Sequence, residues 1–178
     1  RFIYNFMNTL ADKDKFLRLI EANKGIIFKI CNAYCHNKSD REDVAQEIIY
    51  HLWKSGNSFN PDYQFSTWMY RIALNVAISF YRNGRQTIAA APFTGQVFEL
   101  EDSNTSPDET EEHIALLHKF INELKELDRA LMLLYLEAKT YQEIGEILGI
   151  STTNVATKIN RIKTKIKQSF QHNKLIAK

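Results

Sequence analysis

At 178 residues the chain is long enough for one domain or two small ones, and its 44% apolar and 25% charged residues are typical of a globular protein. No apolar run is long enough to span a bilayer, so no membrane insertion is expected, and three Pro and six Gly favour helices over a turn-rich β fold. The net charge of +2 divides into +3 over residues 1–83, −6 over 84–112 and +5 over 113–178, and two basic segments around an acidic one suggest a polyanionic partner that is contacted at two places.

Apolar residues recur at helical spacing through the first part of the chain, with one strong break where Gly, Asn and Pro cluster. Before that break, Val44, Ile48 and Leu52 follow one another at intervals of one helical turn and predict a buried face. Ser39 or Asp40 is the expected N-cap of this helix. The pattern predicts four helices, at about 12–22, 25–37, 40–54 and 63–82.

Aromatic residues concentrate in the stretch FNPDYQFSTWMYRIALNVAISFYR, residues 59–82, which holds seven of the chain's 21. Phe65, Trp68 and Phe80 share an apolar stripe and are expected in the core, whereas the other four are expected at the edge of a loop. A polar stripe runs along the other side of the helix: Arg71, Asn75, Ser79 and Arg82. Aromatic rings mixed with Arg and Asn suit unstacked single-stranded bases, although a well-packed helix with a solvated polar face would give the same pattern.

The helical period is lost over residues 83–108, which hold two of the three prolines and end in an acidic run. This composition predicts a linker. Helical spacing resumes near Glu109, and the nearly all-apolar DRALMLLYLEA is expected to form a central helix. The predicted division is a first domain over 1–83, an acidic linker over 84–110 and a second domain over 111–178.

The stretch TYQEIGEILGISTTNVATKINRIKTKI, residues 140–166, has the features of a helix-turn-helix. Gly145 leaves a bare surface where the second helix can cross closely, and Gly149 suits a left-handed turn. Ile150 fills the corner, and Ser151 is a good N-cap for the second helix. That helix is expected to bury Val155, Ile159, Ile162 and Ile166.

The flank of this second helix carries no negative charge, because residues 151–178 hold seven basic groups and no acidic one. A recognition helix places its N-terminal side chains on base edges in the major groove, where Asn pairs with adenine, and Arg or Lys with guanine or phosphate. The residues expected to contact duplex DNA are Ser151, Thr152, Thr153, Asn154, Thr157, Lys158, Arg161 and Lys165. From these residues alone, a helical hairpin with a solvated lysine face is the alternative.

Taken together, DREDVAQEIIYHLW, the aromatic stretch, the acidic linker and the helix-turn-helix resemble the extracytoplasmic-function (ECF) sigma factors of bacteria over residues 14–170. The resemblance implies an all-α protein with two small helical domains, similar to sigma domains 2 and 4. Such a protein binds core RNA polymerase and directs promoter recognition, promoter melting and transcription initiation in the bacterial cytoplasm. The helix-turn-helix would read the minus-35 duplex, the linker would enter the polymerase cleft and RNA exit channel, and an anti-sigma factor would be a further partner.

The resemblance also implies roles for residues of the first domain. The helix that contains REDVAQEIIYHLW would bind the clamp helices of the polymerase β′ subunit through Asp43, Gln46, Glu47, Tyr50 and Trp53. The loop and helix that follow would capture a flipped base and open the minus-10 element through Asn57, Ser58, Phe59, Asn60, Arg71, Asn75 and Arg82. Two stretches depart from the relatives, because Ser79 stands at a usually acidic position and STTNVATK is an unusual turn, so the duplex sequence it reads is not implied.

Cys31, Cys35 and His36 lie close together in CNAYCH, but zinc usually has four ligands, and no second pair of suitable spacing exists. Two buried thiols are expected instead, with no metal and no cofactor. No phosphate-binding glycine loop, nucleophile elbow or paired-carboxylate pattern is present, so no enzyme activity is expected. Two other classes of protein are considered: a helix-turn-helix regulator that acts without core polymerase, and a metalloenzyme or redox protein built on this cysteine and histidine group.

Overall fold

The structure is a computed structural model that describes residues 9–35, 37–87, 117, 120–121 and 123–176. Over these residues the chain forms seven α-helices and one short 3-10 helix and no strand, which confirms the all-α prediction. The chain divides into two compact units, Arg1–Gln96 and Val97–Lys178, which are described separately.

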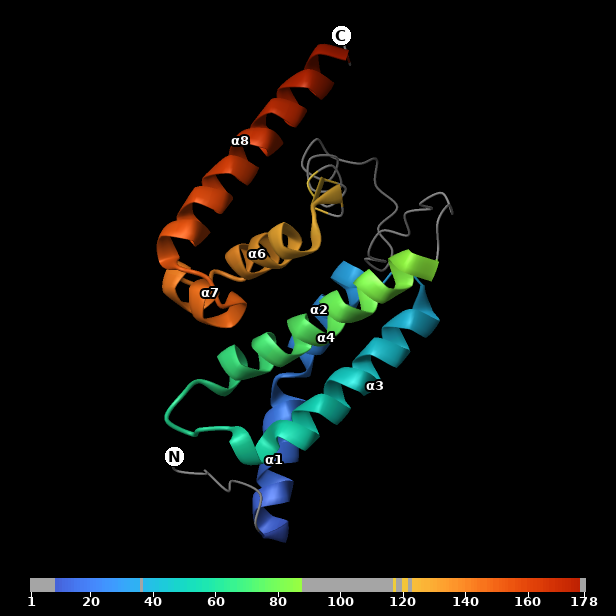
Figure 1. Cartoon of the computed structure of the whole chain (residues 1–178), viewed down its shortest axis with the longest axis vertical. Coiled ribbons are helices and arrows are strands. Elements are labelled where there is room, and N and C mark those ends of the chain that lie inside the picture. Colours follow the sequence, from blue (N-terminus) through green and yellow to red (C-terminus); the bar gives the residue numbers. More distant parts are fainter. Residues whose placement is uncertain (1–8, 36, 88–116, 118–119, 122, 177–178) are drawn as a thin grey trace, which may run out of the picture. The chain divides into compact units, whose positions relative to one another are not determined.

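The first unit is a helical bundle built around one long helix. It contains α1 (Leu10–Ala22), α2 (Lys24–Tyr34), α3 (Lys38–Ser55), the 3-10 helix η1 (Gly56–Ser58) and α4 (Phe65–Thr87). Helices α2 and α3 pack against each other, and both pack along α4, while α1 contacts α2 (Figure 1). The central position of α4 follows from its buried residues, two of which are alanines: Met69, Tyr70, Ala73, Leu74 and Ala77.

All four helices predicted for this unit are present, with differences of a few residues at their ends; α2, for example, ends at Tyr34 and not at residue 37. Asn37, and neither Ser39 nor Asp40, is the N-cap of α3, because the backbone of Asn37 is extended and its Oδ1 accepts a hydrogen bond from the Asp40 N–H at 2.8 Å. Helix α4 begins at Phe65 and continues to Thr87, past the predicted end at residue 82. The helical backbone therefore extends into the segment that was predicted to be a linker.

A cluster of aromatic rings closes the end of this unit where the loop enters α4. The ring of Phe16 from α1 lies 5.7 Å from that of Phe65 and 5.9 Å from that of Trp68, centroid to centroid. Phe59 lies 5.2 Å from Phe65 and 5.3 Å from Trp68. Because edge-to-face and tilted aromatic pairs add to the stabilisation from burial, these contacts hold the loop between α3 and α4 against the core.

The second unit contains α6 (Glu126–Leu136), α7 (Tyr141–Leu148) and α8 (Thr152–Ile176), and each of these helices packs against the other two (Figure 1). The predicted central helix is confirmed, since α6 buries Ala130, Leu131, Met132 and Leu134. Met132 also joins Ile121 and Ile162 in a core cluster that further apolar residues border: Leu117, Phe120, Leu124, Tyr135 and Ile166.

Most of the predicted acidic linker, residues 84–110, lies outside the described part of the chain. Within the part that is described, no helix combines the length and the apolar character that a membrane crossing requires.

Candidate nucleic-acid interface

The turn between α7 and α8 is built by local interactions that the sequence encodes. Gly149 has φ +69°, in the left-handed region, as predicted for the residue that ends α7. The Ile150 N–H donates to the Gly145 carbonyl over 3.1 Å. A Cβ at Gly145 would lie 2.8 Å from the Ile150 carbonyl oxygen, so the close approach expected at this glycine is made by the turn itself.

The start of α7 is fixed by a capping box that the sequence analysis did not single out. The Thr140 hydroxyl accepts from the Glu143 N–H at 3.2 Å, and a Glu143 carboxylate oxygen accepts from the Thr140 N–H at 2.8 Å. Hydrogen bonds that the Glu143 carboxylate accepts from the Thr140 N–H, the Lys139 ammonium and the Thr140 hydroxyl lower the pKa of Glu143 to about 2. The signal was present, because Thr-x-x-Glu before an apolar run is typical of a helix start.

Helix α8 buries one face and exposes the other, as predicted. Val155, Ile159 and Ile162 are buried, and the Ser151 hydroxyl caps the helix by accepting from the Asn154 N–H at 3.2 Å. The exposed face contains most of the residues predicted to contact duplex DNA: Ser151, Thr152, Thr153, Asn154, Thr157, Arg161 and Lys165. This face combines amide, hydroxyl and cationic groups with no carboxylate, which suits a DNA major groove.

Lys158 differs from the rest of that set, because it is held by another helix of the same unit. Its Nζ lies 3.0 Å from Oδ1 of Asp128, which stands in the first turn of α6, and its side chain is only 24% exposed. Arg161 is 62% exposed and lies at 3.7 Å from Oδ2 of the same carboxylate. Asp128 was not predicted as part of this surface, since nothing in the local pattern links it to residues about thirty positions later.

In the first unit, the polar stripe of α4 is exposed at Arg71, Asn75 and Arg82. The aromatic residues that were expected at the edge of the loop divide differently. Tyr63 is 68% exposed, but Phe59 is only 4% exposed and Tyr70 is also buried. For Phe59 and Tyr70 the expectation was wrong, because their rings fill the bundle and so present no open face on which a base could stack.

The loop before α4 carries its remaining polar candidates near the surface. Asn57 and Ser58 are exposed and Asn60 is half-buried. The Ser58 hydroxyl donates to the Ser55 carbonyl at 2.6 Å, and Asn60 Oδ1 accepts from the Asp62 N–H at 2.9 Å. These short-range bonds define the path of the loop, while the buried Phe59 ring between its polar residues anchors it.

The residues expected to bind polymerase, from the resemblance described above, share one side of α3: Asp43, Gln46, Glu47, Tyr50 and Trp53. All five are exposed. Ile49, on the same helix, is also exposed. The surface therefore combines two carboxylates with apolar and aromatic area, which is the chemistry expected for a partner helix of basic and apolar character.

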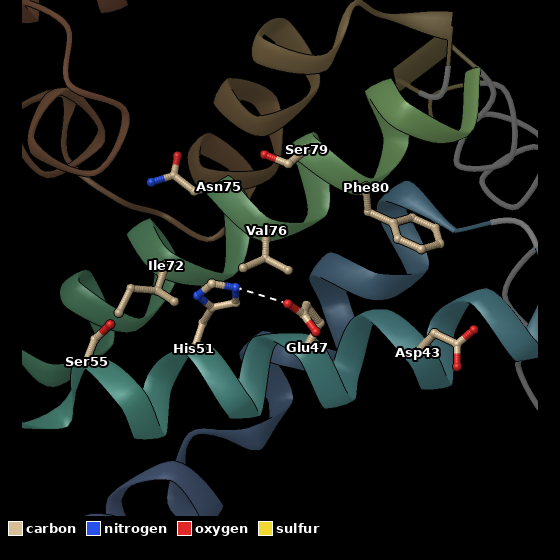
Figure 2. A pocket seen from close by; sticks show the side chains of 9 residues that line it. All are labelled: Asp43, Glu47, His51, Ser55, Ile72, Asn75, Val76, Ser79 and Phe80. Atoms are coloured by element: carbon tan, nitrogen blue, oxygen red, sulfur yellow. Dashed lines mark hydrogen bonds and ion pairs between the residues drawn. The ribbon is translucent and has the colours of Figure 1, made fainter. Parts of the chain in front are cut away.

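Between α3 and α4 runs an open groove with a volume of about 550 Å³. Asp43, Glu47, His51 and Ser55 line it from α3 (Figure 2). From α4, Ile72 and Val76 point toward α3, and the rest of the lining is contributed by Asn75, Ser79 and Phe80. His51 Nε2 lies 3.1 Å from Glu47 Oε1. The groove thus joins the surface expected to bind polymerase to Asn75, which is expected to contact the minus-10 element.

The cysteine pair is confirmed as two buried free thiols. Burial raises the pKa of Cys31 to about 11 and that of Cys35 to about 12, so both remain protonated and unreactive near neutral pH. His36 lies outside the described residues. Among the described side chains, no group of three or more histidine, cysteine or acidic residues is placed to hold a metal ion.

Comparison with known proteins places these features in one family of sequences. The Sigma-70 region 2 family matches residues 19–87, and the Sigma-70, region 4 family matches residues 114–166. The chain is 31% identical over 137 residues to the RNA polymerase sigma factor SigZ of Bacillus subtilis, covering 76% of each chain. It is 26% identical over 161 residues to the ECF RNA polymerase sigma factor SigW of the same species, covering 85% of this chain and 86% of that protein.

Two solved structures have the same fold over most of their length. One is CnrH in complex with the cytosolic domain of CnrY, with a TM-score of 0.64 at 19% identity and 90% coverage of each chain. The other is the sigma factor RpoE in complex with the anti-sigma factor NepR from Bartonella quintana, with a TM-score of 0.63 at 15% identity, covering 92% of this chain and 98% of that chain.

Proposed function

The chain belongs to the ECF sigma factors, which direct RNA polymerase in promoter recognition and initiation, and from this premise we propose how its surfaces divide that work. Helix α8 reads the minus-35 duplex, α4 with the loop before it opens the minus-10 element, and α3 binds core polymerase. The functional divisions are a first domain over 1–83, a linker over 84–110 and a second domain over 111–178. The acidic linker enters a polymerase channel that otherwise carries nucleic acid, which accounts for its charge.

The minus-35 assignment rests on the exposed, carboxylate-free face of α8. Asn154 and Arg161 are the residues proposed to read base edges, because amide and guanidinium groups form bidentate pairs with adenine and guanine. Thr152, Thr153 and Thr157 border them near the N-terminal end, where a recognition helix is closest to the bases. Ser151 caps the helix, so its contribution is to hold that end in place, and Lys165 is suited to a phosphate.

The minus-10 assignment combines Arg71, Asn75 and Arg82 on α4 with the polar loop residues Asn57, Ser58 and Asn60. Opening a duplex costs a few kcal/mol for each base that is unstacked and unpaired, and contacts to an extruded base would offset that cost. Phe59 is proposed to act from inside the bundle, by holding the loop against Phe65 and Trp68. Its burial favours this supporting role over direct stacking on a captured base.

Core polymerase is proposed to bind the exposed face of α3 through Asp43, Gln46 and Glu47, with Tyr50 and Trp53 adding apolar area. The paired carboxylates favour a basic partner, and the exposed aromatic rings are of the type that dominates binding energy at interfaces.

An anti-sigma factor is proposed as a second protein partner, and the cytoplasm as the compartment of action. The support is that a solved relative of the same fold carries an anti-sigma factor, and another carries a cytosolic domain. The family match over both regions favours this reading over a helix-turn-helix regulator that acts without core polymerase.

The test is transcription in vitro with purified core polymerase, on a template selected from a library randomised at both promoter elements. Arg161→Gln should reduce initiation by roughly tenfold on templates with an intact minus-35 element, since one bidentate base contact is worth about 1–3 kcal/mol. Arg71→Gln should instead slow strand opening, followed by a fluorescent base analogue in the minus-10 element. Arg18→Gln, an exposed α1 residue given no role, is the matched control.

Equal losses of duplex recognition and strand opening in both variants would contradict the proposed division of labour. Selection of no transcribed template from the library would count against the assignment of promoter recognition to these surfaces.

A further inference from the structure

Asp128 occupies an unusual place for an acidic residue, because it lies beside the cationic face of the proposed recognition helix. It stands in the first turn of α6, and its side chain is only 14% exposed. Its Oδ1 accepts from Lys158 Nζ at 3.0 Å and its Oδ2 lies 3.7 Å from Arg161 Nη2. One carboxylate therefore meets two of the cations on α8, each with a different oxygen.

The two cations are not held equally. Lys158 has a short contact and a mostly buried side chain, whereas Arg161 has a long contact and remains 62% exposed. A lysine held in this way is less available to DNA, because its ammonium is already paired and its side chain is held near α6. A phosphate would have to compete with a close, partly desolvated carboxylate. The arginine keeps most of its donors directed to solvent.

Helix α6 holds a further lysine of α8 by a similar arrangement. Lys163 Nζ donates to the Tyr135 hydroxyl at 2.6 Å and lies 4.2 Å from the centroid of the Tyr135 ring. Lys163 nonetheless remains exposed, so Lys158 is the α8 cation that α6 restricts most, while Arg161 and Lys165 are exposed cations of the proposed recognition face. The number of cations that DNA can contact is therefore smaller than the sequence suggests.

We propose that Asp128 is a specificity-determining positioning residue, which withdraws Lys158 from the DNA phosphates and leaves Arg161 to read bases. This inference rests on the proposed minus-35 role of α8. Lysine contacts to phosphate raise affinity for any sequence, because they release counterions without reading bases. Holding one such lysine lowers non-specific binding, and it also fixes the helix that presents the base-reading side chains.

The experiment measures binding of the full chain to a random-sequence 30-base-pair duplex by fluorescence anisotropy, over a range of salt concentrations. Asp128→Asn should strengthen binding and steepen the slope of log affinity against log salt by about 0.9, the value for one added phosphate contact. That slope corresponds to a further loss of about 3.5-fold in affinity for each fourfold increase in salt. Asp128→Ala should do the same without leaving an amide to hold the lysine.

Lys158→Gln separates positioning from a structural role. In the wild-type background it should leave the salt slope nearly unchanged, because the lysine is already held by Asp128. In the Asp128→Asn background it should remove most of the gain. Glu146→Gln is the charge-matched control, since it removes an exposed carboxylate that accepts a hydrogen bond from Gln142 within α7.

Three outcomes would overturn the inference. A slope reduced by about one in Lys158→Gln alone would mean that the lysine already contacts DNA. A lower melting temperature in Asp128→Asn, with the slope at the Glu146→Gln value, would mean that the ion pair only holds the two helices together. A gain in Asp128→Asn that survives removal of Lys158 would mean that another group causes it.

Failure of the proposed function itself would look different. Arg161→Gln and Lys165→Gln would then leave affinity for the duplex unchanged, whatever the Asp128 variants do. If the Asp128 variants do not fold, the single Lys158→Gln measurement still decides, because an unchanged slope supports the inference and a reduced one contradicts it.

Discussion

Replacing Gly145 by Ala is expected to destabilise the second unit, although the same substitution usually stabilises a helix. A Cβ at this position would lie 2.8 Å from the Ile150 carbonyl oxygen, a backbone atom of the turn. Ordinary van der Waals contact begins near 3.4 Å, so the turn would have to move. That movement would also disturb the hydrogen bond from the Ile150 N–H to the Gly145 carbonyl, now 3.1 Å long.

The magnitude follows from three opposing effects. Ala is favoured over Gly in a helix interior by about 1 kcal/mol. Overpacking typically costs about 1–3 kcal/mol, and weakening one hydrogen bond costs about 1 kcal/mol. The net expectation is a loss of roughly 1–3 kcal/mol in the free energy of unfolding of the second unit, with weaker duplex binding because α8 is displaced at its N-terminal end.

The assay uses the placement of the tryptophans. Trp53 and Trp68 both lie in the first unit and are the two tryptophans of the chain, so their fluorescence follows the unfolding of that unit. Circular dichroism at 222 nm follows the helices of both units. In urea titrations of the full chain, Gly145→Ala should shift part of the dichroism transition to lower urea and leave the fluorescence transition in place.

Gly25→Ala is the matched control, because nothing lies within 4 Å of a Cβ built on that helical glycine. It should raise the free energy of unfolding of the first unit by at most about 1 kcal/mol, and so shift the fluorescence transition slightly toward higher urea. The reasoning would be refuted if Gly145→Ala were as stable as wild type, or if both variants changed stability in the same direction.

Three further substitutions test other parts of the structure. Ala138→Gly should stabilise the second unit by about 0.5–1 kcal/mol in the same urea titrations, because Ala138 follows the C-cap of α6 at φ 55°, where a Cβ is strained; a loss of stability would contradict this. Glu143 has its pKa lowered to about 2 from the ordinary 4.5, so its bonds stabilise the fold above pH 4.5 and are lost as the pH falls toward 2. Glu143→Gln should cost about 1 kcal/mol at pH 7, a figure reduced for solvent screening, with the difference from wild type vanishing near pH 2; a constant difference across that range would exclude the carboxylate as the cause. Reversing charge at Asp43 and Glu47 to Lys should weaken binding to core polymerase by tenfold or more in a fluorescence titration and leave binding of the full chain to duplex DNA at least as strong; unchanged core affinity would remove these residues from the proposed interface.

The helix-turn-helix shows how much of this protein is determined locally. Gly149 takes a left-handed conformation because it ends a short helix, and Ser151 caps the next one because its hydroxyl reaches the Asn154 N–H. The apolar period then selects which face of α8 is buried. Each of these features depends on residues within a few positions of one another, so the pattern of residues predicts them directly. The four helices of the first unit were predictable for the same reason.

The tertiary structure decided which residues of a stretch remain available for binding. Phe59 and Tyr63 lie in the same loop and have similar aromatic rings, but one is buried among Phe65 and Trp68 while the other is exposed. Local spacing cannot separate them, because the loop has no period, and Phe59 packs on Phe65 and Trp68, whose rings are themselves packed against Phe16 of α1.

Lys158 illustrates the same limit for charge. Its spacing along α8 matches that of Arg161 and Lys165, so the sequence by itself predicts that Lys158 contacts DNA. The tertiary structure changes this, because Asp128 of α6 forms an ion pair with Lys158. The sequence determined which helices form and which of their faces are buried, because those choices are governed by neighbours along the chain. Packing determined which exposed charges are free, because an ion pair between helices depends on how those helices meet.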